Sequence, residues 1–218
     1  MGYLIGVVSQ KGGVGKTTIA RLLACHYAKN DWDVTIADFD TLQSTATKWA
    51  SKRAHANLTP HIKVQPLNDV TIAKKEAEKC DVLIMDGAPF SSRQTLQIAN
   101  AADFVLIPTS TMEEDLEPAV LLARDLTKQG IPKKRLAFIL SRTGPSEVEE
   151  VEARGYIEEA GFSCLEGQTP QKDSYHQALA KGRDLTETPF LTVNVSAKEL
   201  AKNMDTAIAA AINGRTKA

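Results

Sequence analysis

The residues best suited to chemistry lie in one glycine-rich segment near the start of the chain, Ser9-Gln10-Lys11-Gly12-Gly13-Val14-Gly15-Lys16-Thr17-Thr18. Backbone N–H groups of such a turn can surround phosphate oxygens because glycine carries no Cβ to block them. Lys16 would bring a positive charge to the outer phosphates, and the Thr17 hydroxyl is placed to bind Mg²⁺. The segment therefore predicts a nucleotide site whose phosphate-binding residues are Gly12, Gly13, Val14, Gly15, Lys16, Thr17 and Thr18.

The segment departs from the usual phosphate-loop pattern G-x-x-x-x-G-K-[ST], because Gln10 stands where the first glycine should be. It fits the variant K-G-G-x-G-K-[ST], which has an additional lysine, Lys11. A flexible turn with incidental lysines is the competing explanation. An apolar run over residues 3–8 precedes the loop and a helical pattern over 19–28 follows it, as a phosphate loop requires, so the nucleotide site is favoured.

Apolar, β-branched runs alternate with helical patterns along the whole chain. We expect strands at residues 3–9, 34–38, 62–66, 82–86, 104–108 and 136–140, with a weaker one at 162–165. We expect helices at 17–29, 44–55, 69–79, 93–101, 114–129, 147–160, 174–180 and 196–212. This alternation predicts an α/β fold with a doubly wound, mostly parallel sheet flanked by helices, as in P-loop NTPases.

Acidic residues end two of the expected strands. Asp38 and Asp40 close the second strand, and Asp86 closes the strand at 82–86. Ligands of such folds bind at the carboxyl ends of the strands. Asp86 is therefore placed to hold Mg²⁺ through its water shell, whereas a helix cap or a turn is the alternative role.

The composition is that of a soluble protein, with 43% apolar and 24% charged residues among 218. We expect one domain at residues 1–212 and a flexible tail at 213–218. No apolar run is long enough to cross a bilayer, and no export signal is visible. Cys25, Cys80 and Cys164 are scattered without metal-binding spacing, which favours reduced thiols and a cytoplasmic location.

Charge is unevenly distributed although the formal net charge is only −1. Six acids and one arginine lie between residues 147 and 159, whereas lysines and arginines are frequent in the C-terminal third. Local basic patches can bind nucleic acid when the total charge is near zero, although solvated helix faces are an equal alternative. The candidate contacts to DNA phosphates are Lys172, Lys181, Arg183, Lys198 and Lys202.

These motifs together resemble the ParA/MinD group of deviant Walker ATPases, and most closely the short ParA-type DNA-partition ATPases. The resemblance covers nearly the whole chain. It is carried by KGGVGKTT at 11–18, VTIADFDTLQS at 34–44, VLIMDGAP at 82–89 and ADFVLIP at 102–108 with Asp115 downstream, and more weakly by QK at 171–172 and AKG at 180–182.

The resemblance implies roles for individual residues. Lys16 and the loop backbone would bind the phosphates of ATP, while Thr17 and, through water, Asp86 would organise Mg²⁺. Asp40 would position the attacking water, with Asp38 in support. Lys11 would reach the phosphates of a partner copy in an ATP-sandwich dimer, where a cation supplied in trans stabilises charge on the transferred phosphoryl group.

The resemblance also implies a function, namely a Mg²⁺-dependent ATP hydrolase with slow basal turnover. The ATP-bound homodimer would bind DNA without sequence preference, and a ParB-type or small adaptor protein would stimulate hydrolysis. The cargo would be plasmid or chromosomal DNA, and the protein would be associated with the nucleoid. The same switch could instead position a protein cluster, a conjugation complex or a microcompartment.

Two other classes are disfavoured. A MinD-like membrane ATPase needs a C-terminal amphipathic helix with bulky apolar residues. The apolar residues among 207–218 are mostly alanine, so no stable membrane binding is expected. An iron–sulfur relative needs paired thiolates, and the three cysteines form no matching pair.

The chain departs from the pattern of the ParA/MinD group at Thr41, where proline is usual, at Gly87-Ala88-Pro89 and at Lys172. It also has Ser141-Arg142 where many members have Asn-Arg beside the base, so the adenine contacts stay unassigned.

Overall fold

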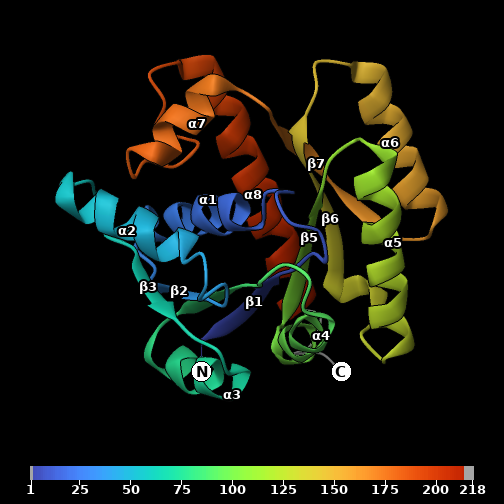
Figure 1. Ribbon diagram of the computed structural model, residues 1–218, viewed down its shortest axis with the longest axis horizontal. Helices are drawn as coiled ribbons and strands as arrows, with labels where there is room; N and C mark the ends of the chain where they lie inside the picture. The colour runs from blue at the N-terminus through green and yellow to red at the C-terminus, as the bar shows by residue number, and fades with distance from the viewer. Residues whose placement is uncertain (1, 214–218) are drawn as a thin grey trace.

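A sheet of seven strands forms the centre of the protein in the computed structural model, which describes residues 2–213 (Figure 1). The strand order is β3-β2-β4-β1-β5-β6-β7, and every registered pair is parallel. The strands are β1 (Tyr3–Val7), β2 (Val34–Asp38), β3 (Lys63–Pro66), β4 (Val82–Asp86), β5 (Phe104–Thr109), β6 (Leu136–Thr143) and β7 (Ser163–Pro170). The predicted doubly wound α/β fold is therefore confirmed.

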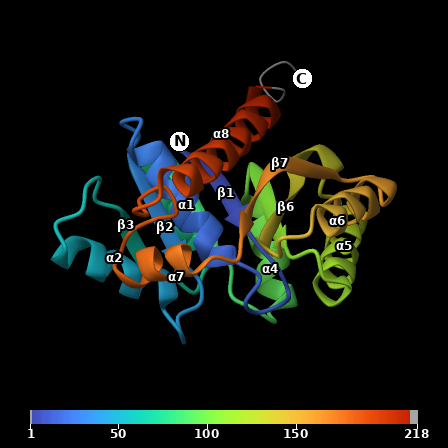
Figure 2. The same ribbon diagram turned by 90° about the horizontal axis from the view of Figure 1, so that it is seen from above.

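Helices cover both faces of this sheet. They are α1 (Lys16–Ala28), α2 (Thr45–His55), α3 (Val70–Glu76), α4 (Ser92–Ala101), α5 (Glu113–Lys128), α6 (Glu147–Glu159), α7 (Asp173–Ala180) and α8 (Leu191–Asn213), with short 3₁₀ turns η1 (Ala77–Lys79) and η2 (Lys133–Arg135). The core on one face includes residues of α1, α2, α7 and α8, and the core on the other face includes residues of α3 to α6. Figure 2 shows α5 and α6 side by side at one end of the molecule, away from α2 and α7.

The central strands are apolar on both sides because each side faces a helical layer. In β4, Leu83 and Met85 point into one core, while Val82 and Ile84 point into the other. All four are at most 1% exposed. Since polar ligands cannot enter this interior, a functional site must lie at the edge of the sheet, where the strands end.

Several element boundaries differ from those predicted, and three elements are longer by at least three residues. β7 continues to Pro170, β6 continues to Thr143, and α8 begins at Leu191. The ends of β6 and β7 pair with each other and carry polar residues, including Ser141 opposite Thr169, so apolar runs alone underestimate their length. Asn213 still belongs to α8, and the remainder of the predicted tail, residues 214–218, lies outside the described residues.

Across residues 2–213, no helix has the length and apolar character needed to cross a membrane. All three cysteines are free thiols, with Cys25 buried and the other two half-buried.

Candidate nucleotide-binding site

The register of the sheet brings the predicted site residues to one edge. Val7 at the end of β1 lies opposite Asp86 of β4, and Asp86 lies opposite Asp38 of β2. The glycine-rich loop leaves β1 at this same edge and leads into α1. Residues from three distant parts of the chain are therefore neighbours because parallel strands end together.

At Gly15 the loop has a backbone conformation that favours glycine. Its φ is +98°, and a Cβ there would lie 2.2 Å from the Ser141 hydroxyl oxygen. Gly15 also precedes the first residue of α1 and supplies no side-chain cap. The first N–H groups of α1 therefore point at the loop without an internal side-chain acceptor, which is the arrangement that binds a phosphate at a helix N-terminus.

Lys16 begins α1 and is 6% exposed. Its Nζ donates to the carbonyl oxygen of Lys11 at 2.9 Å, which holds the ammonium against the loop. Burial lowers the pKa of Lys16, while the nearby carboxylates of Asp86 and Asp40 work to raise it. The structure thus places a partly desolvated cation among acids, where an anionic phosphate would gain a strong partner.

Asp86 is an orphaned buried carboxylate. It is 1% exposed, and among the described residues neither of its oxygens accepts a hydrogen bond of ordinary geometry, although the Thr17 hydroxyl lies near enough to act on its pKa. Burial raises the pKa of Asp86 to about 7, an effect that the neighbouring Thr17, Arg21 and Lys16 side chains partly offset. Magnesium prefers oxygen ligands and keeps several waters, so the Thr17 hydroxyl and the unpaired Asp86 carboxylate fit such an ion.

Asp38 is fully buried, and its carboxylate is occupied by hydrogen bonds within the chain. Oδ2 accepts from the backbone N–H of Thr47 at 3.0 Å and from its hydroxyl at 2.9 Å, and Oδ1 accepts from the N–H of Asp40 at 3.2 Å. Asp38 therefore ties the loop that carries Asp40 to the first turn of α2. Asp40 itself is half-buried and lines the cavity described next.

A cavity of about 320 Å³ lies beside the loop. Thr18, Asp40 and Lys16 line one side of it, and the segment after β7 lines the other. Sequence reasoning missed the part of that lining formed by Gln43, Thr45, Pro170, Gln171, Tyr175, His176, Leu179 and Leu185. Knowing that β7 ends at Pro170 would have placed residues 171–176 at the site, because the segment after a parallel strand begins at the ligand edge.

Lys11 does not line this cavity. Its Nζ forms an ion pair with Asp115 and donates to the carbonyl oxygen of Glu114 at 3.0 Å. The Lys11 side chain is 41% exposed. The structure thus separates the two lysines of the loop, with Lys16 at the cavity and Lys11 on the surface.

The five predicted DNA contacts are exposed but do not form one patch. Lys172 lies at the rim of the nucleotide cavity, next to α7. Lys181 and Arg183 follow the C-terminal end of α7, and Lys198 and Lys202 lie four residues apart on α8. The structure therefore distributes the candidate contacts over three locations.

Comparison with known proteins identifies the family of the chain. The family model described as the CobQ/CobB/MinD/ParA nucleotide binding domain matches residues 5–185. The chain is 28% identical over 189 residues to "Maintenance of carboxysome distribution protein A" of Gloeobacter kilaueensis, covering 84% of each protein. It is 27% identical over 195 residues to the "Chromosome-partitioning ATPase Soj" of Thermus thermophilus, covering 72% of this chain and 78% of Soj.

The fold is also similar to that of a solved structure. The septum site-determining protein MinD of Pyrococcus horikoshii, complexed with Mg-ADP, superposes with a TM-score of 0.76 at 18% identity. The superposition covers 94% of this chain and 96% of that one. Because the family model spans most of the chain, including the phosphate loop, Asp40 and Asp86, this protein belongs to the CobQ/CobB/MinD/ParA family of nucleotide-binding ATPases.

Proposed function

We propose that this ATPase is a partition switch that acts as an ATP-sandwich dimer on DNA. The observation that carries the proposal is the pair of lysines in one phosphate loop, with Lys16 buried at the cavity and Lys11 exposed outside it. Lys16 can bind the phosphates of the nucleotide in its own chain, whereas Lys11 can bind the phosphates of a nucleotide held by a second copy.

The residues of the loop would bind and orient ATP. The N–H groups at the start of α1 and the Lys16 ammonium would hold the phosphates, while Thr17 and, through water, Asp86 would hold Mg²⁺. The ion would neutralise charge on the phosphate oxygens. Asp40 orients the water that attacks the terminal phosphate, and Asp38 fixes Asp40 through its backbone N–H. Lys11 of the partner copy would stabilise the charge that develops during transfer.

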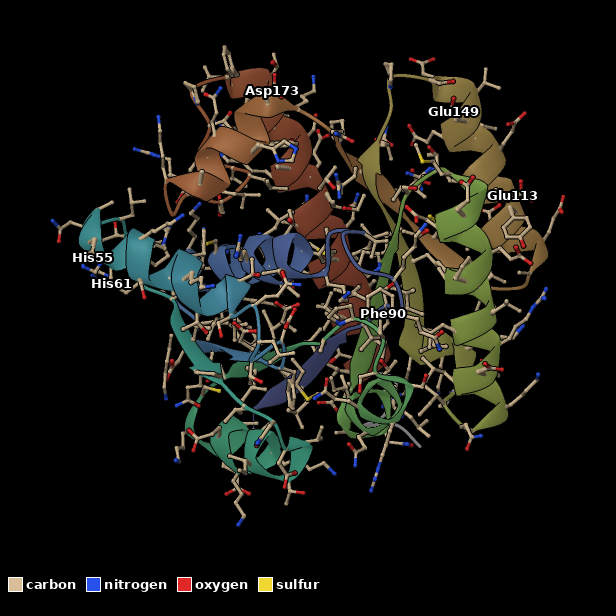
Figure 3. All side chains as sticks on the ribbon, viewed as in Figure 1. His55, His61, Phe90, Glu113, Glu149 and Asp173 are labelled. Carbon is tan, nitrogen blue, oxygen red and sulfur yellow. The ribbon has the colours of Figure 1, made fainter. Side chains whose placement is uncertain are left out.

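The surface around Lys11 supports a dimer on this face. Phe90 is 80% exposed, and its N–H donates to the carbonyl oxygen of Gln10 at 2.9 Å, next to the loop (Figure 3). The Phe90 ring is also the nearest group to a Cβ placed on Gly12, at 3.6 Å. Exposed aromatic rings are enriched at protein interfaces, and this one lies against the loop that carries Lys11.

The proposed cargo is plasmid or chromosomal DNA, which the dimer would bind through its phosphates without reading the sequence. A small DNA-binding adaptor would stimulate hydrolysis and release the dimer, so the protein would be found on the nucleoid. The 27% identity to the chromosome-partitioning ATPase Soj supports this choice. The 28% identity to a carboxysome distribution protein supports one alternative cargo, a protein microcompartment moved by the same switch.

The experiment measures binding to several unrelated DNA duplexes by fluorescence anisotropy with ATP, with ADP and without nucleotide. The proposal expects binding in ATP that has similar affinity for every duplex and weakens steeply with salt. Absence of DNA binding in every nucleotide state would overturn the DNA-based function. Sedimentation with anionic lipid vesicles, run in parallel, would reveal a membrane-associated ATPase instead.

A further inference from the structure

The segment that contains α2 is strongly basic. Residues 41–68 include no aspartate or glutamate, but they include Lys48, Lys52, Arg53 and Lys63. Arg53 is not available to a ligand, because it is 1% exposed and its guanidinium donates to both carboxylate oxygens of Glu187 at 2.8 and 3.0 Å. The charges that remain open to solvent on α2 are therefore those of its two lysines.

Lys48, Lys52 and His55 follow one another at helical spacing and are all exposed. Residues four or three apart lie on the same face of a helix, so these three form one row about 10 Å long. Two adjoining hollows, of about 570 and 540 Å³, lie between this row and α7. We call them together the α2–α7 groove; both are lined by Lys52 and Ala180, and no acidic residue of the described chain lines either.

α7 can approach α2 this closely because of Gly182. Its φ is +76°, and a Cβ there would lie 2.4 Å from the backbone nitrogen of Arg53. Two hydrogen bonds fix the contact. The Trp49 ring N–H donates to the carbonyl oxygen of Arg183 at 2.9 Å, and Arg53 donates to that of Gly182 at 3.2 Å. Lys181, which lines the groove, is thereby held opposite the lysine row.

The groove lies far from the acidic part of the molecule. Figure 3 shows His55 at the outer end of α2, on the opposite side of the protein from Glu113 and Glu149. Those two residues belong to the helices α5 and α6, which carry three acids in each first turn. A polyanion would therefore be attracted to the groove side and repelled from the other side.

We propose that the α2–α7 groove binds the sugar–phosphate backbone of nucleic acid. The proposal rests on the DNA-based function above. It assigns the surface to Lys48 and Lys52, which sequence reasoning did not select, together with Lys181, which it did. A row about 10 Å long matches about three phosphates at 3.4 Å per nucleotide. A lipid surface would also need bulky apolar side chains beside the lysines, and within residues 2–213 Leu42 is the one exposed large apolar residue that lines the groove.

The groove adjoins the nucleotide cavity, which gives ATP a route to control it. Gln43, Thr45 and Leu179 line both. Asp38, next to Asp40, also holds the first turn of α2 through Thr47. Movement of the Asp40 loop on nucleotide binding would therefore shift the N-terminal end of the lysine row.

The test compares three double variants that each remove two exposed lysines. Lys48→Ala/Lys52→Ala removes the row in the groove. Lys198→Ala/Lys202→Ala removes a pair with the same spacing on α8. Lys74→Ala/Lys75→Ala removes two exposed lysines of α3 as a control for net charge. Anisotropy with a fluorescent duplex and ATP gives the affinity of each at several salt concentrations.

The groove variant is expected to bind DNA at least about tenfold more weakly than wild type at about 0.1 M salt, with a salt slope reduced by about 0.9 for each phosphate that the protein no longer neutralises. Its thermal stabilisation by ATP should equal that of wild type, which shows that the chain is folded. Equal DNA affinity in the groove variant and the α3 control would overturn the proposal. Failure of wild type itself to bind DNA would instead refute the proposed function.

Discussion

The ammonium of Lys11 pairs with the carboxylate of Asp115 in the same chain. Asp115 is in turn held by Ser110, whose hydroxyl donates to its other oxygen at 2.6 Å. In an ATP-sandwich dimer, Lys11 would contact the partner's phosphates instead. Forming that dimer would therefore break the contact with Asp115 in both copies, which opposes association by the free energy of two ion pairs.

Asp115→Asn should strengthen ATP-dependent dimerisation. A partly exposed ion pair contributes about 1 kcal/mol or less, and each dimer breaks two of them. The dimer constant is therefore expected to rise by about 30-fold at most, and less at high salt. Sedimentation velocity with ATP and Mg²⁺ measures it, and Glu117→Gln, on the exposed face of α5, is the control. A weaker dimer in Asp115→Asn would show that the contact assists association.

Lys11→Ala should bind ATP as wild type does but fail to form the dimer. The side chain lies outside the cavity of its own chain, so its loss leaves the phosphate site intact. Light scattering with ATP reports the dimer, and isothermal titration reports the nucleotide affinity. An unchanged dimer fraction would refute the contact between Lys11 and the partner's phosphates. Loss of ATP binding would show that Lys11 contacts the nucleotide bound by its own chain.

Asp40→Ala should bind ATP, form the dimer and turn over at least about 100-fold more slowly, because no carboxylate remains to orient the attacking water. Thr41→Ala is the control, since Thr41 is exposed and adjacent. Phosphate release gives the rate. If Asp40→Ala hydrolyses ATP at the wild-type rate, another residue must orient the attacking water.

Glu187→Gln should destabilise the fold by about 3 kcal/mol near neutral pH, because it leaves Arg53 buried without its anionic partner. Burial works to raise the pKa of Glu187, but hydrogen bonds from Arg53 and the Asp184 N–H and the charge of Lys29 hold it at about 2. This carboxylate therefore contributes stability above its unfolded pKa of about 4.3, and the contribution is lost as pH falls towards 2.

Urea denaturation at pH 7 and at pH 3.5 measures this contribution. The difference between Glu187→Gln and wild type should shrink at the lower pH, and Glu78→Gln, at an exposed position in η1, should match wild type at both. A difference that is the same at both pH values would show that the lost stability comes from packing and not from the charge.

The sequence was sufficient to predict the doubly wound fold and the neighbourhood of the loop with Asp86, because apolar runs mark buried strands and parallel strands end at one edge. The contacts of Lys11 and Arg53 could not be predicted. Their partners, Asp115 for Lys11 and Glu187 for Arg53, lie far along the chain, and both contacts depend on how the helices pack. The polar end of β7 was missed because it carries no apolar run, and the cavity lining beyond it was missed with it.

Thermal unfolding with saturating ATP and Mg²⁺ tests the central claim, that residues 12–18 bind the triphosphate with Lys16 as the essential cation. At about 100 times the Kd, a ligand stabilises the native state by about 2.7 kcal/mol, or roughly 5–10 °C in Tm for a chain of this size. Wild type and Lys128→Ala, a control on α5, should show this shift and Lys16→Ala should show none. An equal shift in Lys16→Ala would contradict the account.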